Sequence, residues 1–202
     1  MILFEITEDE NHDEYRQLEY SNLIRQQSFL DSIIQSSIRM DRRFLSQEII
    51  KALNYHVVTC LHVNAGAYRP CEVCVGNFKP PKHYRVQALM DDFINIANEN
   101  WQGADPFLLS AYVYWKINYI HPFINGNGRT ARASCYFVLC VKSGGIIKGT
   151  DTLPKLLQEH RPECVELLKA ADEMYKAGRP LPEILGPLAG LIHRLSTQQV
   201  SS

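Results

Sequence analysis

Apolar residues recur every three or four positions along most of the chain, which is the spacing of one face of a helix. In the first long segment, Leu30, Ile33, Ile34 and Ile38 fall on such a face. The residues before it, 1–13, are acidic and lack a period, which is typical of a frayed arm or an edge segment. The pattern predicts helices over residues 14–38, 46–62, 83–99, 105–120, 128–141, 153–159, 162–177 and 182–196.

Two of these helices begin with recognisable capping residues. Ser46 and Asp105 have short side chains whose oxygens accept hydrogen bonds from first-turn amides, and Pro106 suits the first helical position. Residues 128–141 are apolar on most sides, which predicts a central, buried helix. The long helical segments therefore indicate an all-α architecture.

One segment departs from the helical pattern. Residues 71–77 are short and β-rich, end in the turn signal Gly76-Asn77, and predict a small β-hairpin. Cys71 and Cys74 have the spacing of a zinc site, but such a site needs four ligands and the chain has no second Cys-x-x-Cys pair. We therefore interpret both cysteines as residues of the hairpin.

Composition narrows the class of protein without defining it. Of 202 residues, 46% are hydrophobic and 21% are charged, which is ordinary for a globular domain. The 21 basic and 22 acidic residues exclude a global field that would attract nucleic acid or an anionic membrane, so any anion site is local. No apolar run reaches the roughly 18 residues of a membrane span. The acidic start does not resemble a signal peptide, and we expect a cytoplasmic protein whose cysteines are reduced.

The richest candidate chemistry lies in residues 121–132. Gly126 and Gly128 permit positive φ angles and close backbone approach, and successive amides in such a turn form an anion-binding concavity. The turn leads directly into a helix, whose N-terminus adds free N–H groups and a positive dipole end. Arg129 and Arg132 lie three positions apart on that helix. Two guanidinium groups beside a nest of amides suit a polyphosphate.

Two further residues extend this candidate site. Asn127 offers a side-chain amide donor, and His121, just before the loop, titrates near neutral pH. A base beside a phosphate-binding loop indicates phosphoryl or nucleotidyl transfer to a hydroxyl group. Taken singly, each feature also fits an ordinary interhelical turn with solvated arginines. The chain has no Walker-type glycine loop.

The segment from His121 to Arg132 resembles the signature of the Fic (Fic/Doc) family: His-Pro-Phe, any residue, Asp or Glu, Gly-Asn-Gly-Arg, two residues, Arg. Residues 66–81 are similar to the segment that forms the Fic flap. The resemblance covers roughly residues 20–175 and implies an all-α, Fic-type helical bundle with a small β-hairpin flap. It divides the chain into an N-terminal arm and helix with a candidate regulatory role (1–45), a Fic core (46–180), and a C-terminal helix and tail (181–202).

The resemblance also implies an activity, the transfer of AMP from ATP to a Ser, Thr or Tyr hydroxyl of a target protein. His121 would be the general base and Phe123 a buried anchor of the loop. Arg132 would bind the outer phosphate. Asn127, Gly128 and Arg129 would hold the inner phosphates, with Gly126 shaping this phosphate-binding loop, and Arg129 would also be a catalytic residue. The flap would bind the target segment as an added strand through Cys71, Glu72, Val73, Cys74 and Val75.

Asn125 departs from the family pattern, which has Asp or Glu at this position to hold Mg²⁺. Asn offers one neutral oxygen, whereas Mg²⁺ prefers carboxylates and water. Three interpretations follow: weakened Mg²⁺-dependent AMP transfer, transfer of another phosphate-containing moiety, or nucleotide binding with little turnover. In the last case the protein would be a degenerate Fic domain that binds a nucleotide or a protein partner.

The sequence contains one candidate inhibitory motif and leaves the partners of the protein open. Many family members block the counterpart of Arg132 with a helix that reads Ser/Thr, three residues, Glu. Here Ser37 and Asp41 have that spacing, although a charged surface loop explains them equally well. The sequence leaves open a homo-oligomer, delivery into a host cell, and a toxin-like role with an antitoxin partner.

Overall fold

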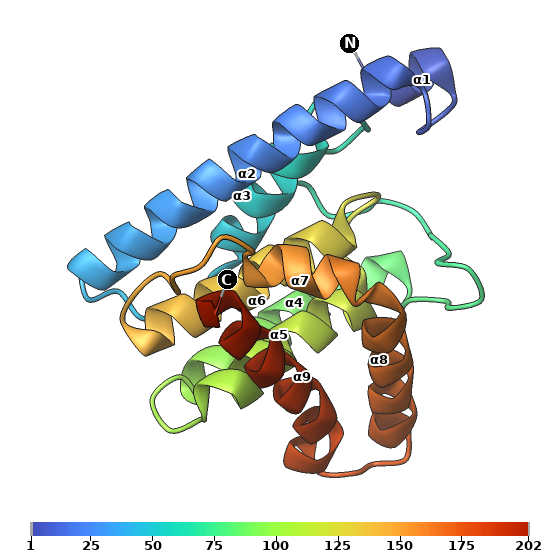
Figure 1. Ribbon diagram of the computed structural model, residues 1–202. Coiled ribbons are helices and arrows are strands. Elements are labelled where there is room, and N and C mark those ends of the chain that lie inside the picture. Colours follow the sequence, from blue (N-terminus) through green and yellow to red (C-terminus); the bar gives the residue numbers. More distant parts are fainter. Residues whose placement is uncertain (1, 202) are drawn as a thin grey trace.

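The computed structural model describes residues 2–201, and most of them are helical (Figure 1). The predicted all-α class is confirmed. The helices, in chain order, are α1 (Leu3–Thr7), α2 (Asp13–Arg39), α3 (Gln47–Val58), the 3₁₀ turn η1 (His83–Arg85), α4 (Val86–Glu99), α5 (Pro106–Ile120), α6 (Asn127–Ser143), α7 (Leu153–Glu159), α8 (Arg161–Lys176) and α9 (Leu181–Ser201).

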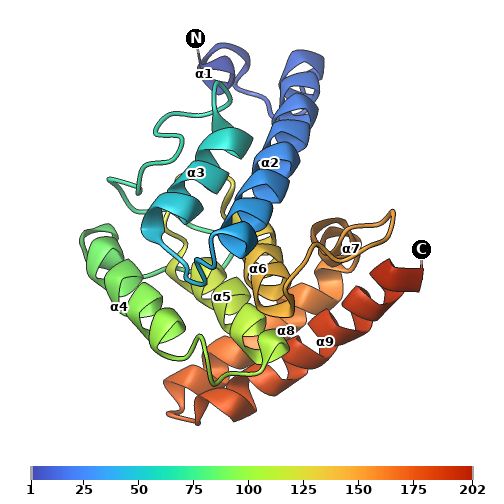
Figure 2. The ribbon, with the colours of Figure 1, turned by 90° about the vertical axis from the view of Figure 1, so that its left-hand side faces the viewer.

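Helices α5 and α6 form the centre of the molecule. They pack against each other, and α3 and α2 cover α6 on one side while α9, α8 and α4 cover α5 (Figure 2). The predicted burial of α6 is confirmed, because Phe137, Val138 and Cys140 are fully buried. In α5, Trp115 is also fully buried. The segment 121–126 between these two helices is thereby fixed at both ends by the core.

The predicted helix starts follow the expected capping chemistry. The Ser46 hydroxyl accepts a hydrogen bond from the Ile49 N–H at 3.2 Å. The Asp105 carboxylate accepts from the N–H groups of Phe107 and Leu108 at 2.9 and 3.0 Å. Local sequence chemistry thus fixes where α3 and α5 begin.

The N-terminal residues are more ordered than the aperiodic sequence predicted. Leu3 and Phe4 begin the short helix α1, and their N–H groups donate to the carbonyl oxygens of Cys60 and Leu61 at 2.8 and 3.1 Å. The Phe4 ring lies 4.6 Å from the His62 ring, centroid to centroid. The prediction of a frayed arm was wrong because these contacts come from a distant loop.

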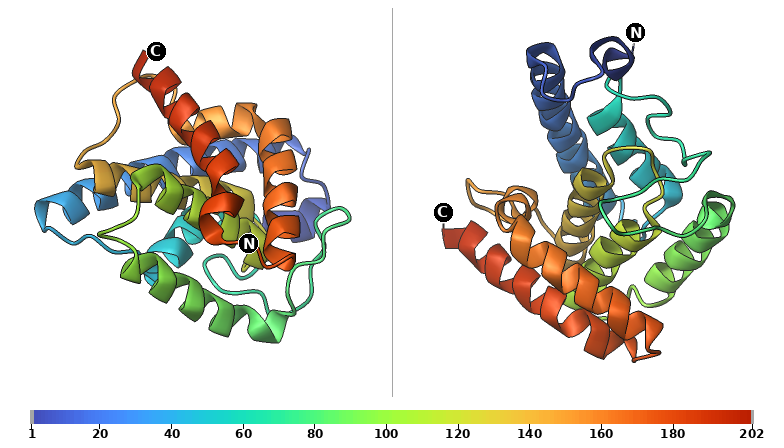
Figure 3. Two further views of the ribbon diagram at one scale, coloured as in Figure 1. Left: turned by 90° about the horizontal axis from the view of Figure 1, so that it is seen from below. Right: turned by 90° about the vertical axis from the view of Figure 1, so that its right-hand side faces the viewer.

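That loop, residues 59–82, runs outside the helices between α3 and η1 (Figures 1 and 3). The helix predicted to reach residue 62 ends at Val58, and Cys60 adopts a left-handed φ of 62°. The predicted hairpin does not form: within residues 2–201 this loop has one isolated bridge, between Val75 and Phe78. The segment is too exposed to bury the face that stabilises a hairpin.

None of the helices within residues 2–201 is long and apolar enough to cross a membrane. The proposed boundaries at residues 45 and 180 stay a prediction.

Candidate active site

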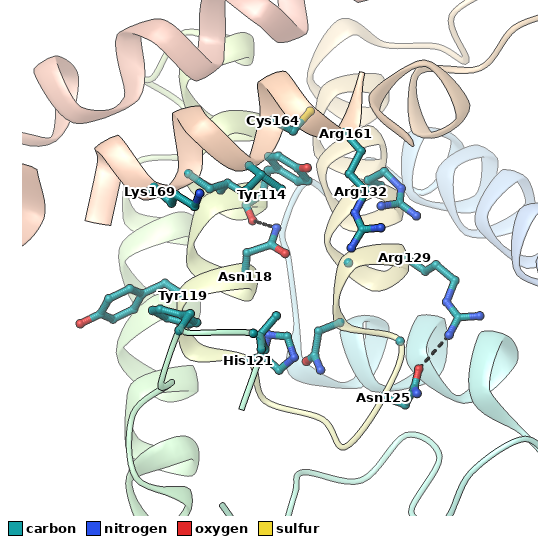
Figure 4. Close-up of a pocket in the computed structure, with 18 of the residues that line it drawn as sticks. Tyr114, Asn118, Tyr119, His121, Asn125, Arg129, Arg132, Arg161, Cys164 and Lys169 are labelled. Atoms are coloured by element: carbon teal, nitrogen blue, oxygen red, sulfur yellow. Dashed lines mark hydrogen bonds between the residues drawn. The ribbon is translucent and has the colours of Figure 1, made fainter. Parts of the chain in front are cut away.

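A cavity of about 870 Å³ opens where the α5–α6 loop meets the flap and α8. The loop supplies His121 and the glycine turn, and the flap supplies residues 74–78. Helix α8 adds Arg161 and Lys169 from the opposite wall, and Arg129 and Arg132 lie on α6 (Figure 4). The cavity therefore brings together the histidine, the glycines and both arginines that the sequence singled out.

Gly126 makes the turn into α6 because it tolerates a conformation that other residues avoid. Its φ is +77°, and a Cβ at this position would lie 2.5 Å from Val58 Cγ2. Gly128 behaves differently, since it lies in the first helical turn of α6 and does not have a positive φ. A Cβ there would be 3.5 Å from Arg132 Nη1. The missing side chain therefore leaves the amides and this guanidinium open to the same ligand.

Three N–H groups at the start of α6 are available to an anion. The first N–H of α6 with a backbone partner is that of Thr130, which donates to Gly126 O at 2.9 Å. Within the described residues, no hydrogen bond uses the N–H groups of Asn127, Gly128 and Arg129. Free amides at the positive end of a 17-residue helix form an anion site.

The Asn127 side chain has a different role from the donor predicted by sequence. Its Oδ1 accepts from the Phe123 N–H, and its Nδ2 donates to the Phe123 carbonyl, both at 2.9 Å. Asn127 is buried, as is Phe123, whose ring lies 5.6 Å from that of Tyr68. The side chain therefore locks the loop, and only the backbone N–H of Asn127 remains for a ligand.

The two arginines of α6 differ in their surroundings. Arg129 Nη1 lies 2.5 Å from Glu19 Oε1 on α2, and its Nη2 donates to Asn125 Oδ1 at 2.8 Å. For Arg132, no hydrogen bond or ion pair is found within residues 2–201. Burial lowers its pKa, and repulsion from Arg129 and Arg161 lowers it further. A partly buried guanidinium without a counterion is a strong anion ligand.

His121 ends α5 in a left-handed conformation, with a φ of 51°. Burial lowers the pKa of His121, the Asn118 backbone raises it and the positive charge of Arg69 lowers it, which together give a pKa of about 4. The ring is therefore neutral at pH 7. A neutral imidazole has one ring nitrogen that carries no proton and can therefore accept one.

Arg69 holds the flap against the loop that carries His121. No pattern in the sequence pointed to this role. It is 2% exposed, and its Nε donates to the His121 carbonyl at 2.8 Å while its Nη1 donates to the Cys71 carbonyl at 3.0 Å. It also donates to the carbonyl of Pro81. One guanidinium thus joins the loop between α5 and α6 to both ends of the flap.

Asn54, which is fully buried on α3, holds the glycine turn through hydrogen bonds. Its Nδ2 donates to the Asn125 carbonyl at 2.9 Å and to Thr130 Oγ1 at 3.2 Å, and its Oδ1 accepts from the Gly66 N–H at 2.9 Å. No pattern in the sequence points to Asn54, because its partners lie up to 76 positions away.

Of the flap residues predicted to bind a target, 71–75, the last two reach the cavity. Cys74 and Val75 line it, while Cys71 is exposed. Glu72 is held outside by His83, whose Nδ1 lies 2.9 Å from Glu72 Oε1, and this hydrogen bond lowers the pKa of the exposed carboxyl.

Asn125 does not fit the role of a Mg²⁺ ligand. Its side-chain oxygen accepts from Arg129, and its amide nitrogen lies 3.1 Å from Glu10 Oε1 and 2.8 Å from His62 Nε2. Among the described residues, no group of three or more His, Cys, Asp and Glu side chains could hold a metal ion. We therefore assign no catalytic step to a metal.

The proposed inhibitory pair does not reach the cavity. Asp41 follows α2 and pairs with Arg43 at 2.8 Å, and Ser37 lies on the same distant end of that helix. An inhibitory role for this pair therefore stays a prediction. The acidic residue of α2 that pairs with an arginine of α6 is Glu19, which lies near the N-terminal end of α2 and contacts Arg129 at 2.5 Å.

This geometry defines a class of protein: a helical domain with an anion site at a glycine turn and a neutral histidine beside it. Residues 44–139 match the model of the Fic/DOC family, and this part of the chain is a Fic domain. The resemblance seen in the sequence is thereby confirmed.

Curated relatives match a limited stretch of the chain. Protein adenylyltransferase fic-1 of Caenorhabditis briggsae is 40% identical over 73 residues, which are 35% of this chain and 14% of the relative. Protein adenylyltransferase Fic of Drosophila persimilis is 38% identical over 71 residues, again 35% and 14%. The match therefore spans about one seventh of the length of these relatives.

Solved structures show the same fold over nearly all of the chain. A Fic domain containing signaling protein from Bacteroides thetaiotaomicron has a TM-score of 0.72 at 18% identity and covers 98% of this chain and 76% of that one. Fic-1 from Caenorhabditis elegans has a TM-score of 0.62 at 22% identity and covers 92% and 52%. At these identities the likeness establishes the fold.

Proposed function

We propose that the protein transfers AMP from ATP to a Ser, Thr or Tyr hydroxyl of a target protein. The observation that carries this proposal is one cavity that holds a neutral His121, the free amides of residues 127–129 and the unpaired Arg132. Relatives named protein adenylyltransferases support the same donor and acceptor at the level of the family.

In the proposed reaction, His121 accepts the proton of the target hydroxyl. The hydroxyl oxygen forms a bond to the α-phosphorus, and the bond from that phosphorus to the bridging oxygen of the β-phosphate breaks. Pyrophosphate leaves with the electron pair. The low pKa keeps His121 free to accept a proton, and nearby phosphate charge raises that pKa because it stabilises the imidazolium.

The phosphates would be bound by backbone and side-chain donors of α6. The amides of Asn127, Gly128 and Arg129 face the cavity at the positive end of the helix. Arg132 supplies a charge that no protein group neutralises within the described residues. Preorganised donors of this kind stabilise the charge that develops on the leaving group.

The flap would hold the target by strand addition. Within the described residues, no hydrogen bond uses the backbone N–H groups of Glu72, Val73 and Cys74. Such an unpaired edge is available to an extended peptide, and Arg69 fixes its base relative to His121.

His121→Ala tests the base. We expect transfer of labelled AMP from ATP to fall by a factor of at least about 100, whereas ATP affinity changes by less than about threefold because the amides and Arg132 remain. His12→Ala is the matched control, because His12 pairs with Glu14 on the surface. Intact-mass spectrometry and calorimetric titration give the two readouts. Full transfer by His121→Ala would remove the histidine from the mechanism.

A second candidate is a Fic domain that binds a nucleotide with little turnover. It is favoured by Arg129, whose guanidinium is already paired with Glu19, and by the poor fit of Asn125 to a metal. Under this alternative, ATP binds at saturating concentration but neither the protein nor any protein in a cell lysate gains the mass of AMP.

A further inference from the structure

Asn125 is the centre of a polar cluster that joins the glycine turn to the N-terminal residues. Its Oδ1 accepts from Arg129 Nη2 at 2.8 Å, and its Nδ2 lies 3.1 Å from Glu10 Oε1 and 2.8 Å from His62 Nε2. Glu10 also contacts His62 at 3.0 Å. The sequence separations of 115 and 63 residues show that tertiary structure creates this cluster.

The polarity of these contacts requires an amide at position 125. One end of the side chain faces a hydrogen-bond donor, and the other faces a carboxylate and a ring nitrogen. Asn satisfies both ends. An Asp would keep the contact with Arg129 but would place a second carboxylate oxygen against that of Glu10.

The charges around the cluster leave no spare cation for an added carboxylate. Arg129 is already paired with Glu19 at 2.5 Å. Burial lowers the pKa of His62, which keeps its ring neutral at pH 7, and Tyr15, whose hydroxyl lies 2.8 Å from His62 Nε2, has its pKa raised to about 12 by burial. The guanidinium of Arg129 is therefore already paired with one carboxylate, and Glu10 contacts a neutral ring and a neutral amide.

We propose that Asn125 is a hydrogen-bond donor to the N-terminal arm rather than a weakened metal ligand. Glu10, His62 and Asn125 are positioning residues that hold the glycine turn in its anion-binding form. The arm reaches the turn because α1 is anchored on the 59–62 loop by the N–H groups of Leu3 and Phe4. A residue from outside the matched family segment thus helps to shape the phosphate site.

The test exchanges the donor and the acceptor of the hydrogen bond between Asn125 and Glu10. Asn125→Asp should weaken ATP binding at least fivefold, both with EDTA and with millimolar Mg²⁺, a change of the size measured for coupled neighbours. Glu10→Gln alone should weaken ATP binding less than Asn125→Asp does, because the new amide oxygen still accepts from Asn125 although the charge of the carboxylate is lost. When both substitutions are combined, the new amide at position 10 donates to the new carboxylate at position 125. We expect this double variant to bind ATP within about twofold of the unmodified protein.

Amide hydrogen exchange provides a readout that does not depend on the nucleotide. Exchange at Leu3 and Phe4 should accelerate in Asn125→Asp and return toward its original rate in the double variant. Glu14→Gln, added to Asn125→Asp, is the matched control and should restore nothing, because Glu14 pairs with His12 on the surface. If Asn125→Asp does not fold, a folded double variant supports the proposal and an unfolded one overturns it.

Two results would refute the proposal: tighter, Mg²⁺-dependent ATP binding by Asn125→Asp, or a double variant as weak as the single one. The inference concerns the site of the proposed AMP transfer, but ATP binding and amide exchange test it without turnover. Its failure would therefore leave the transfer reaction untouched, and loss of transfer would not decide it.

Discussion

Replacing each of the two glycines of the turn by Ala should have different effects. Gly126→Ala should lower the free energy of unfolding, whereas Gly128→Ala should lower the affinity for ATP. At Gly126, the φ of +77° costs a residue with a Cβ about 1–2 kcal/mol. The added Cβ would lie 2.5 Å from Val58 Cγ2 and 3.0 Å from Asn54 Nδ2, and overpacking of this kind costs about 1–3 kcal/mol. We therefore expect Gly126→Ala to lower the free energy of unfolding by roughly 2–5 kcal/mol.

Gly128→Ala is the matched variant, because Gly128 has a helical backbone and its nearest neighbour would be Arg132 Nη1 at 3.5 Å. Ala in place of Gly in a helix stabilises by up to about 1 kcal/mol. The new methyl group would nevertheless lie beside the free amides and reduce ATP affinity. Gly128→Ala should thus be at least as stable as the unmodified protein and bind ATP more weakly.

Urea unfolding, followed by circular dichroism, measures the first effect, and calorimetric titration with ATP measures the second. Equal unfolding free energies for the two variants would refute the assignment of Gly126 to the corner of the turn. Unchanged ATP affinity in Gly128→Ala would show that phosphates do not approach the start of α6.

Two further predictions concern charge. Glu19→Gln should raise ATP affinity by about fivefold, because it removes the carboxylate that competes for Arg129, and a partly exposed ion pair contributes on the order of 1 kcal/mol. The control Glu14→Gln, on the same helix, should leave ATP affinity unchanged. Equal effects of the two substitutions would contradict the prediction. In the folded protein His121 has a pKa of about 4, below the ordinary value of about 6.5. Between about pH 4 and pH 6.5 the unfolded chain therefore binds more protons than the folded one, and the free energy of unfolding should rise with pH over this range. Comparison with His121→Asn by urea unfolding at several pH values isolates this contribution from that of His62, and an equally steep pH dependence in the variant would refute it.

Local chemistry made much of the architecture predictable. Ser46 and Asp105 mark helix starts through contacts two or three residues away, and the apolar pattern of 128–141 anticipates the buried α6. The candidate site in the loop between α5 and α6 was predictable for the same reason, because His121, the glycines and both arginines lie within twelve consecutive residues.

The supporting residues were not predictable in this way. Arg69, Asn54 and His62 act on the loop across 52, 71 and 63 positions, and nothing in their immediate neighbours distinguishes them from surface residues. Asn127 fits the expected pattern but uses its side chain to bind the Phe123 backbone, which only the folded loop shows. The sequence therefore reveals the residues that would contact a ligand, but not the distant residues that hold the loop in place.

The link between Glu10 and Asn125 also has a consequence for synthesis of the chain. The two residues are 115 positions apart, and at about 5–20 residues per second a ribosome needs roughly 6–23 s to travel from one to the other. During that interval the N-terminal residues lack the partner that fixes them over the turn. A nascent chain thus passes through a long stage in which the residues of α2 and α3 have been made but the candidate anion site has not, and that site is completed only after α6 has emerged.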